Sequence, residues 1–388
     1  MSVKVPKRIL PTIIFSQFAG TSLWFAGNAV VSQMQLHGPG YYGSVAALTS
    51  AVMLGFIAGT FVFAFFSLAD RFKASKVFFV CALLGALTNM AVLFTPQSYT
   101  GWLAFRFLTG FFLAGIYPVG MKIASDWYKG GLGKALGYLV GALVLGTAFP
   151  YLLNYYGNLF DWQNVLLGTS FLAIVGGFVM LKAVGDGPHR SRGASFEPKK
   201  IIQVFKKPDF RAAAFGYFGH MWELYAFWAF LPEIITYYNR YKHPLIHASL
   251  GTFLIIAVGA IACVIGGIWS IKKGSAKVAV SFLTLSGIMC LISPLLFELP
   301  PALFFGGLLI WGFAVIGDSA QFSSLNAQTA PPEFVGTALT IAVSIGFLLT
   351  IPSIQLLGYL PIDTKWIMLP LVIGPIFGLI STRKLLSK

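Results

Sequence analysis

The chain has 388 residues, of which 57% are hydrophobic and only 10% are charged, and its mean hydropathy is +0.79. A soluble domain carries about 25% charged residues, so this composition excludes an ordinary soluble protein and indicates an integral membrane protein. The formal net charge of +15 would suggest a nucleic-acid partner in a soluble chain, but the distribution of the charges points to another origin.

Apolar blocks follow one another along the whole chain, each long enough for a membrane-spanning helix of about 20 residues. They lie near 9–31, 43–67, 77–95, 101–121, 135–156, 163–184, 211–238, 248–271, 278–297, 302–326, 335–358 and 366–382. We therefore predict an all-α integral membrane protein with twelve transmembrane helices. The first block follows Lys4, Lys7 and Arg8, but it is longer than the apolar region of a signal peptide, and we interpret it as an uncleaved span.

Lysine and arginine are distributed unevenly over the connecting segments. If the N-terminus is cytoplasmic, three of the 27 basic residues (Arg240, Lys242 and Lys365) lie on the opposite side, Arg106 lies within a span, and the others lie on the cytoplasmic side. Cytoplasmic loops of membrane proteins are enriched in basic residues. We therefore expect a multi-pass protein of the cytoplasmic (inner) membrane with both termini in the cytoplasm, and no nucleic-acid partner.

The spans are arranged as six plus six. The widest polar break, residues 185–210, lies close to the midpoint, and "GIYPVG" from Gly115 is echoed by "GDSAQF" from Gly317 about half a chain later. Internal repeats are typical of secondary transporters. We predict three parts: an N-terminal six-helix half (1–184), a cytoplasmic basic linker (185–209) and a C-terminal six-helix half (210–388).

The turn between the second and third blocks carries a recognisable motif. The segment "LADR" (68–71) resembles the signature Gly-x-Leu-Ala-Asp-Arg-x-Gly-Arg-Lys of the major facilitator superfamily, although Phe66 and Lys73 stand where the family has glycine. Arg106 with Gly110 resembles a looser family pattern in the fourth span. The resemblance implies a fold of two pseudo-symmetric six-helix halves that rock about a central site, giving alternating access.

The same resemblance implies a gate. Asp70 and Arg71 are expected to contribute to it, with the Asp70 carboxylate facing the positive N-terminus of a helix that starts at "PPEFVG" (331–336) and includes Glu333. The alternative is that the basic residues of the turn only fix the topology. The fifth-span pattern of the family's antiporters is absent from "GYLVGALVLGTAFP", which favours uptake over efflux.

Three ionisable residues lie well inside apolar blocks: Arg106, Glu223 and Asp318. A charge at the middle of a bilayer is costly, so such residues are functional candidates, and we predict that these three take part in proton coupling. A buried carboxyl favours its protonated form, which is the condition for carrying a proton. The alternatives are a structural Glu223 bonded to a neighbouring helix, and an Asp318 that binds substrate or braces the fold.

Glu223 shares a helix face with three other residues. His220 precedes it by one turn, and Gly216 and Phe227 lie on the same face by helical spacing. Such a face suits a cavity wall better than lipid. We expect substrate-binding residues on this span and on the other cavity-lining spans, with packing as the alternative role; the candidates are His220, Trp222, Tyr225, Gln17, Asn28, Tyr117 and Gln321.

Other chemistry is not indicated. The chain has no nucleotide-binding P-loop, no nucleophile motif and no Cys/His cluster, and its three cysteines lie in apolar blocks. We therefore expect no enzyme activity, no cofactor and no metal. The sequence favours a monomeric secondary transporter, a symporter that takes up a small organic solute with protons. The alternatives are a proton-driven drug or metabolite efflux antiporter, and a non-transporting receptor or sensor.

Overall fold

In a computed structural model the described residues are 5–35, 44–95, 98–128, 132–156, 161–190, 200–242, 246–361 and 363–386. They form helices and no strand, which confirms the predicted all-α class. The chain divides into two compact units, unit 1 (1–195) and unit 2 (196–388). The finer division with a linker at 185–209 stays a prediction, and its residues 191–199 lie outside the described part.

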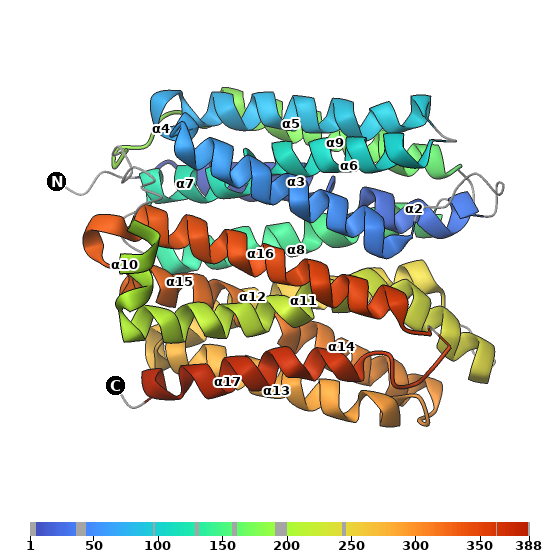
Figure 1. Cartoon of the computed structure of the whole chain (residues 1–388). Helices are drawn as coiled ribbons and strands as arrows, with labels where there is room; N and C mark the ends of the chain where they lie inside the picture. Colours follow the sequence, from blue (N-terminus) through green and yellow to red (C-terminus); the bar gives the residue numbers. More distant parts are fainter. Residues whose placement is uncertain are drawn as a thin grey trace. The chain divides into compact units, whose positions relative to one another are not determined.

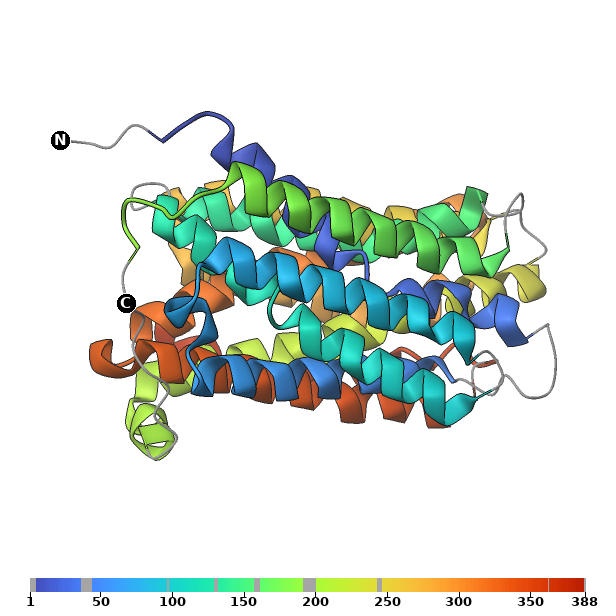
Figure 2. The ribbon, with the colours of Figure 1, turned by 90° about the horizontal axis from the view of Figure 1, so that it is seen from above.

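Unit 1 is a bundle of helices whose neighbours are far apart in the sequence. In chain order the helices are α1 (Ile9–Thr21), α2 (Ala26–Gln35), α3 (Val45–Phe65), α4 (Leu68–Arg71), α5 (Ala74–Ala91), η1 (Val92–Phe94), α6 (Tyr99–Leu113), α7 (Tyr117–Trp127), α8 (Leu132–Tyr156) and α9 (Trp162–Ala183). Helix α3 packs against α6, α5 packs against α9, and α1 packs against both α8 and α9 (Figures 1 and 2).

Unit 2 is organised around its longest helix, α11. Its helices are α10 (Ile201–Lys206), α11 (Pro208–Lys242), α12 (Ala248–Lys273), α13 (Ser275–Leu296), α14 (Pro301–Gly317), α15 (Ser319–Thr329), η4 (Pro332–Phe334), α16 (Val335–Tyr359), η5 (Leu369–Val372) and α17 (Ile373–Leu386). Helix α11 packs against α16 and α17, and α14 packs against α12 and α13 (Figure 1).

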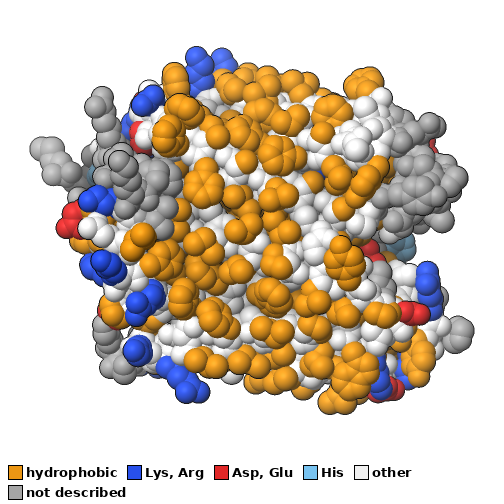
Figure 3. All heavy atoms as spheres, viewed as in Figure 1, with side chains coloured by type: hydrophobic (Ala, Val, Ile, Leu, Met, Phe, Trp, Pro, Cys, Tyr) orange, Lys and Arg blue, Asp and Glu red, His pale blue; other side chains and the backbone are white. Residues whose placement is uncertain are grey.

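Eleven helical stretches of the described chain are long and apolar enough to cross a membrane. Helix α11 stands where the seventh predicted block lies; it has 35 residues but carries several charged ones, Glu223 and Glu233 among them. The eleven stretches and α11 together correspond to the twelve predicted spans. Over the middle of the helices the visible side chains of each unit are hydrophobic, whereas Lys and Arg gather at the helix ends (Figure 3).

Three spans are broken within the apolar region. The first is interrupted between α1 and α2, the fourth between α6 and α7, and the tenth between α14 and α15. Helices α7 and α15 have 11 residues each, and their N-cap residues are Ile116 and Asp318. These two breaks fall within the repeated segments "GIYPVG" and "GDSAQF", so the weak sequence repeat corresponds to a shared backbone feature.

Glycine allows the closest helix contacts. A Cβ on Gly55 of α3 would collide with the backbone carbonyl of Phe107 in α6, and one on Gly110 of α6 would collide with the carbonyl of Val52. Small residues at such positions let two backbones approach and gain van der Waals contact, which is a main source of helix association in lipid. The α3–α6 pair is therefore fixed by backbone contact more than by side-chain interdigitation.

Candidate functional site

The centre of unit 2 contains a buried pair of ionisable groups. His220 Nδ1 on α11 lies 2.8 Å from Asp318 Oδ1 at the break between α14 and α15, and the two side chains are 1% and 0% exposed. The imidazole ring also packs beside Phe322, with ring centroids 6.2 Å apart. The break places the Asp318 carboxyl beside α11, so two residues that are distant in sequence lie at ion-pair distance.

Glu223 lies one turn along α11 and is enclosed by three donors. Its Oε1 accepts hydrogen bonds from Trp311 Nε1 (2.6 Å) and Cys290 Sγ (3.3 Å), and its Oε2 is 2.9 Å from Ser286 Oγ. The side chain is 1% exposed, and Asp318 is near enough to act on it electrostatically. Two carboxyls and one imidazole thus share a small dry volume in which a net charge would be expensive.

The helix face that carries these residues is packed against neighbouring side chains, and its predicted role as a cavity wall stays a prediction. Gly216 is covered by Phe322 and Thr382, and Phe227 stacks on Trp311 with centroids 4.4 Å apart. The face is packed because α13, α14, α15 and α17 each present polar or aromatic side chains to it. Polar groups on a span can be satisfied by neighbouring helices as well as by a water-filled space.

Arg106 of α6 is wholly buried in unit 1 and bonds to the break in the first span. Its guanidinium donates to the carbonyls of Leu23 and Trp24 and, at 2.9 Å, to Asn89 Oδ1. Those carbonyls have lost their helical partners because α1 ends at Thr21. These contacts are those of a brace that satisfies an interrupted backbone, and the predicted role in proton coupling stays a prediction.

Gln17 of α1 has the surroundings in unit 1 that His220 has in unit 2. Its side chain abuts Gly120, the fourth residue of α7, and His220 packs on Phe322, the fourth residue of α15. Gln17 is 0% exposed, and neither atom of its amide has a partner in the part of the chain that the structure describes. Buried polar groups are normally hydrogen-bonded, so this amide is available to a ligand or water.

The other predicted substrate residues are dispersed among packing contacts. Asn28 donates to Thr49 Oγ1 at 2.6 Å, and the Tyr117 ring meets Trp24 edge-on at 6.5 Å. In unit 2 the Trp222 indole reaches the carbonyl of Pro370 at 3.4 Å. Their companions Tyr225, which packs on Phe347, and Gln321 in α15 are buried.

The turn that carries the family signature is tied down within unit 1. Asp70 pairs with Lys122 of α7 at 2.9 Å, and Lys122 also lies 3.6 Å from Asp126. Arg190, beyond α9, donates to the carbonyl of Phe72 at 3.0 Å. Sequence reasoning missed Lys122 because it considered only helix ends as partners of Asp70.

The remaining predicted gate residues, Arg71 and Glu333, are exposed at the ends of their units. Glu333 lies in η4, and Val335 begins α16 directly after it, as expected for a proline-rich helix start. The predicted contact between Asp70 and this helix start stays a prediction.

Sequence reasoning also missed several polar residues of the spans. Ser286 and Cys290 are four residues apart on α13 and reach the same carboxyl, a spacing that could have been noticed beforehand. Glu233 of α11 was not singled out; its Oε2 is buried and has no partner among the described residues. It adds a further carboxyl to the span that already carries Glu223.

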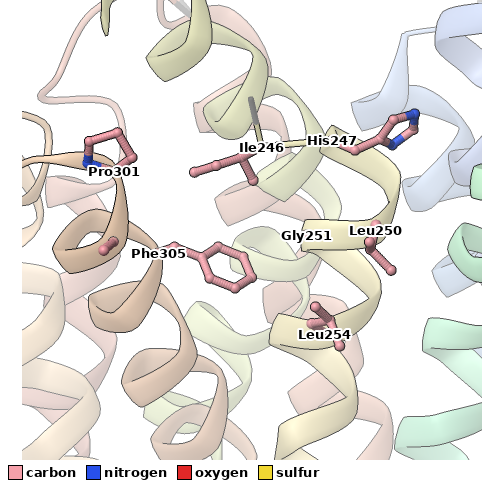
Figure 4. A pocket seen from close by; sticks show the side chains of 8 residues that line it. Ile246, His247, Leu250, Gly251, Leu254, Pro301 and Phe305 are labelled. Atoms are coloured by element: carbon pink, nitrogen blue, oxygen red, sulfur yellow. The ribbon is translucent and has the colours of Figure 1, made fainter. Parts of the chain in front are cut away.

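Unit 2 also has an apolar pocket apart from these groups, between the starts of α12 and α14 (Figure 4). Its volume is about 310 Å³. Its lining is almost wholly apolar: Ile246, His247, Leu250, Gly251, Leu254, Pro301, Ala302 and Phe305. None of the predicted site residues contributes to it.

Comparison with known proteins gives the family. The model of the Major Facilitator Superfamily matches residues 9–353. Over 170 residues the chain is 32% identical to the niacin transporter NiaP of Acinetobacter baylyi, which covers 40% of this chain and 36% of that protein. Over 222 residues it is 26% identical to the uncharacterized transporter C417.10 of Schizosaccharomyces pombe, covering 53% of this chain and 41% of that protein.

The fold has a close counterpart among solved structures. The crystal structure of the human organic anion transporter MFSD10 (TETRAN) matches with a TM-score of 0.74 at 14% identity, covering 98% of this chain and 100% of that chain. The alignments with the two curated relatives span less than half of either relative, whereas the family model covers most of the present chain. The resemblance drawn from the signature turn is confirmed: the chain belongs to the major facilitator superfamily.

Proposed function

We propose that the protein is a proton-coupled secondary transporter that takes up a small organic solute by alternating access. The observation that carries this proposal is the buried cluster in unit 2, where His220 lies 2.8 Å from Asp318 and Glu223 lies within electrostatic range of Asp318. Intramembrane ionisable groups are expensive, and proton relays are among their established uses. The sequence contains no nucleotide-binding P-loop that could supply another source of energy.

The cluster can bind a proton in more than one way. When Asp318 is ionised, His220 Nδ1 lies at ion-pair distance from its charge; when Asp318 binds a proton, that negative charge is lost and any charge attraction across the contact ends. The second ring nitrogen, His220 Nε2, has no partner among the described residues. Protonation therefore changes how firmly α11 is held at the break between α14 and α15, which is a route from proton binding to helix movement.

The substrate is proposed to be a small organic molecule, with a small aromatic carboxylate as the first class to examine. The relative that suggests this class is named as a niacin transporter. In unit 1 the amide of Gln17, with both polar atoms unpartnered, can donate to and accept from such a molecule. The other candidate binding residues are His220, Trp222, Tyr225, Asn28, Tyr117 and Gln321.

Gating is proposed to involve the exposed ends of the bundle. Asp70 is held by Lys122 at 2.9 Å with both side chains only about one-fifth exposed, and Arg71 and Glu333 are accessible. Exchange of Asp70 between Lys122 and another positive partner would open and close one end of the protein. The basic residues at this end support a cytoplasmic location in an inner membrane, where the protein would act as a monomer.

The test is proton movement in proteoliposomes that contain the purified full chain. A pH jump is applied while pooled metabolites are added, with niacin tested first. We expect substrate-dependent proton movement that Glu223→Gln and Asp318→Asn abolish. The matched control is Glu298→Gln, which alters a carboxyl on an exposed side chain outside the spans.

Two results would overturn the proposal. The first is solute movement without protons, or normal coupling in both variants, which would make the cluster structural. The second is proton movement opposite to that of the solute, which would identify an efflux antiporter. Binding without any turnover of the pooled solutes would favour a receptor or sensor.

A further inference from the structure

The two oxygens of Glu223 have different kinds of partner. An indole N–H is a donor only, so Oε1 must accept the 2.6 Å hydrogen bond from Trp311 in every protonation state of the carboxyl. A carbonyl oxygen accepts hydrogen bonds more strongly than a carboxylic hydroxyl oxygen, so a proton on Glu223 is favoured on Oε2, which faces Ser286 Oγ at 2.9 Å. This geometry favours Oε2 as the oxygen that carries the proton.

Ser286 has a second polar neighbour. Its Oγ lies 3.2 Å from the carbonyl of Leu283, one turn back on α13. A hydroxyl can donate one hydrogen bond and accept others at the same time. Because both neighbours are within reach, the hydroxyl hydrogen can point toward Glu223 or toward Leu283 without movement of any heavier atom.

We propose that Ser286 is a positioning residue that lets Glu223 gain and release a proton inside closed packing; this inference rests on the proposed function. With Glu223 ionised, Ser286 donates to Oε2. When a proton binds, the Oε2–H bond forms, Oε2 becomes the donor to Ser286 Oγ, and the serine hydrogen turns to the carbonyl of Leu283. One proton is gained, no other covalent bond changes, and every polar atom keeps a partner.

The charges around Glu223 explain why such an arrangement is needed. On its own helix stands His220, which is engaged by Asp318 from the break between α14 and α15. Helix α13 contributes the thiol of Cys290, and α12 contributes Cys263, which lies near Asp318. Helix α16 carries no charged residue in Val335–Tyr359, and α17 carries basic residues only in its last turn.

Among the described residues no lysine or arginine forms an ion pair with Glu223. A proton is then the means by which this carboxyl becomes neutral. A site that must change its charge without reorganising its packing needs a partner that both donates and accepts. Of the three groups that touch Glu223, only Ser286 has a second acceptor at hydrogen-bond distance, because Trp311 is a fixed donor and a thiol is a weak one.

The experiment compares Ser286→Thr with Ser286→Val, which have the same shape and differ in the hydroxyl. Ser286→Ala removes the hydroxyl without adding bulk. The matched control is Ser293→Ala, because the buried Ser293 also bonds one turn back, to the carbonyl of Cys290. Each variant of the full chain is examined by infrared difference spectroscopy across a pH titration, and Glu223→Gln identifies the Glu223 carboxyl band.

We expect a protonated-carboxyl band in the wild type, in Ser286→Thr and in Ser293→Ala that is missing from Glu223→Gln. In Ser286→Val and Ser286→Ala this band should change in frequency, and its titration midpoint should move by about one pH unit, as for loss of one hydrogen bond to a charged group. An unchanged band and midpoint in both variants would overturn the inference while leaving proton coupling intact. If Glu223→Gln removes no band and couples normally, the proposed function fails at this residue instead.

Discussion

Trp311 and Glu223 are joined by a 2.6 Å hydrogen bond between two helices of unit 2, with the indole as donor. The indole ring is also stacked on Phe227, so one side chain provides both packing and polarity. Trp311→Phe keeps most of the stacking but removes the donor. Since a donor to a buried carboxyl is lost, we expect destabilisation of about 1–3 kcal/mol, measured as the unfolding free energy in detergent.

The control for this prediction is Trp222→Phe. That indole reaches its acceptor, the carbonyl of Pro370, only at 3.4 Å and is partly exposed. Trp222→Phe should lower the unfolding free energy clearly less than Trp311→Phe does. Equal losses in the two variants would mean that Trp311 acts through packing alone.

Arg106 is predicted to be irreplaceable by lysine. Arg106→Lys keeps the charge, but an ammonium group does not reproduce the planar fork that serves Asn89 and the carbonyls of Leu23 and Trp24. Because buried carbonyls and a buried charge are left poorly paired, we expect a loss of about 2 kcal/mol or more. The loss of stability is measured by thermal unfolding of Arg106→Lys. The control is Arg211→Lys, at an exposed position. Similar melting temperatures for both variants would contradict the brace.

The close contact between α3 and α6 predicts that alanine substitution destabilises the fold at Gly55 but not at Gly306. Gly55→Ala would place its Cβ against the carbonyl of Phe107, whereas a Cβ at Gly306 meets nothing within 4 Å. Overpacking of this kind costs about 1–3 kcal/mol, while Gly306→Ala should be neutral or stabilise by about 0.5 kcal/mol through helix propensity. The unfolding free energies of both variants test this prediction. An unchanged stability of Gly55→Ala would show that α3 and α6 can move apart at no cost in free energy.

A pH-dependent contact lies outside the spans. Lys365 Nζ is 2.6 Å from Glu298 Oε1, and this hydrogen bond and the lysine charge hold the pKa of the Glu298 carboxyl below its ordinary value. A carboxyl with a lowered folded pKa stabilises the fold above its unfolded pKa of about 4.3, and the contribution is lost as pH falls through the folded pKa. Lys365→Met should therefore lower the melting temperature slightly at neutral pH.

The same variant should approach the wild type in acid, once the pH has fallen through the folded pKa of Glu298 and the carboxyl is protonated. The effect is small at any pH because both side chains are largely exposed and screened by salt. Lys272→Met, at an exposed position at the end of α12, is the comparison. A melting difference for Lys365→Met that persists unchanged in acid would contradict the assignment to Glu298.

The sequence predicted the spans well because apolar length alone specifies a membrane helix, and the six-plus-six repeat agrees with the equal lengths of α7 and α15. Glu223 and Asp318 were singled out because a charged side chain inside an apolar span costs free energy. The sequence did not reveal that Asp318 pairs with His220, nor that Ser286 and Trp311 enclose Glu223. Those partners lie far along the chain, and only the packing of α11 against other helices brings them together.

The packing partners of the Glu223 helix face were hidden for a related reason. A polar stripe on one helix is compatible with water or with polar side chains of neighbouring helices, and a single sequence does not distinguish them. The brace formed by Arg106 was equally hidden, because two of its three acceptors are backbone carbonyls in the turn between α1 and α2. The sequence shows which buried side chains need hydrogen-bond partners. It does not show which backbone carbonyls are free to accept those hydrogen bonds, because that depends on where the helices break.

The matching breaks before α7 and α15 have an evolutionary consequence. A duplicated ancestral segment would pass on the backbone interruption to both copies, and the residue at that point then diverged, to Ile116 in one copy and Asp318 in the other. Such a duplication would let the backbone geometry be inherited independently of the side-chain chemistry at that position. A protein built in this way can acquire a new substrate or coupling ion by exchanging one side chain at an inherited interruption, without redesigning the scaffold.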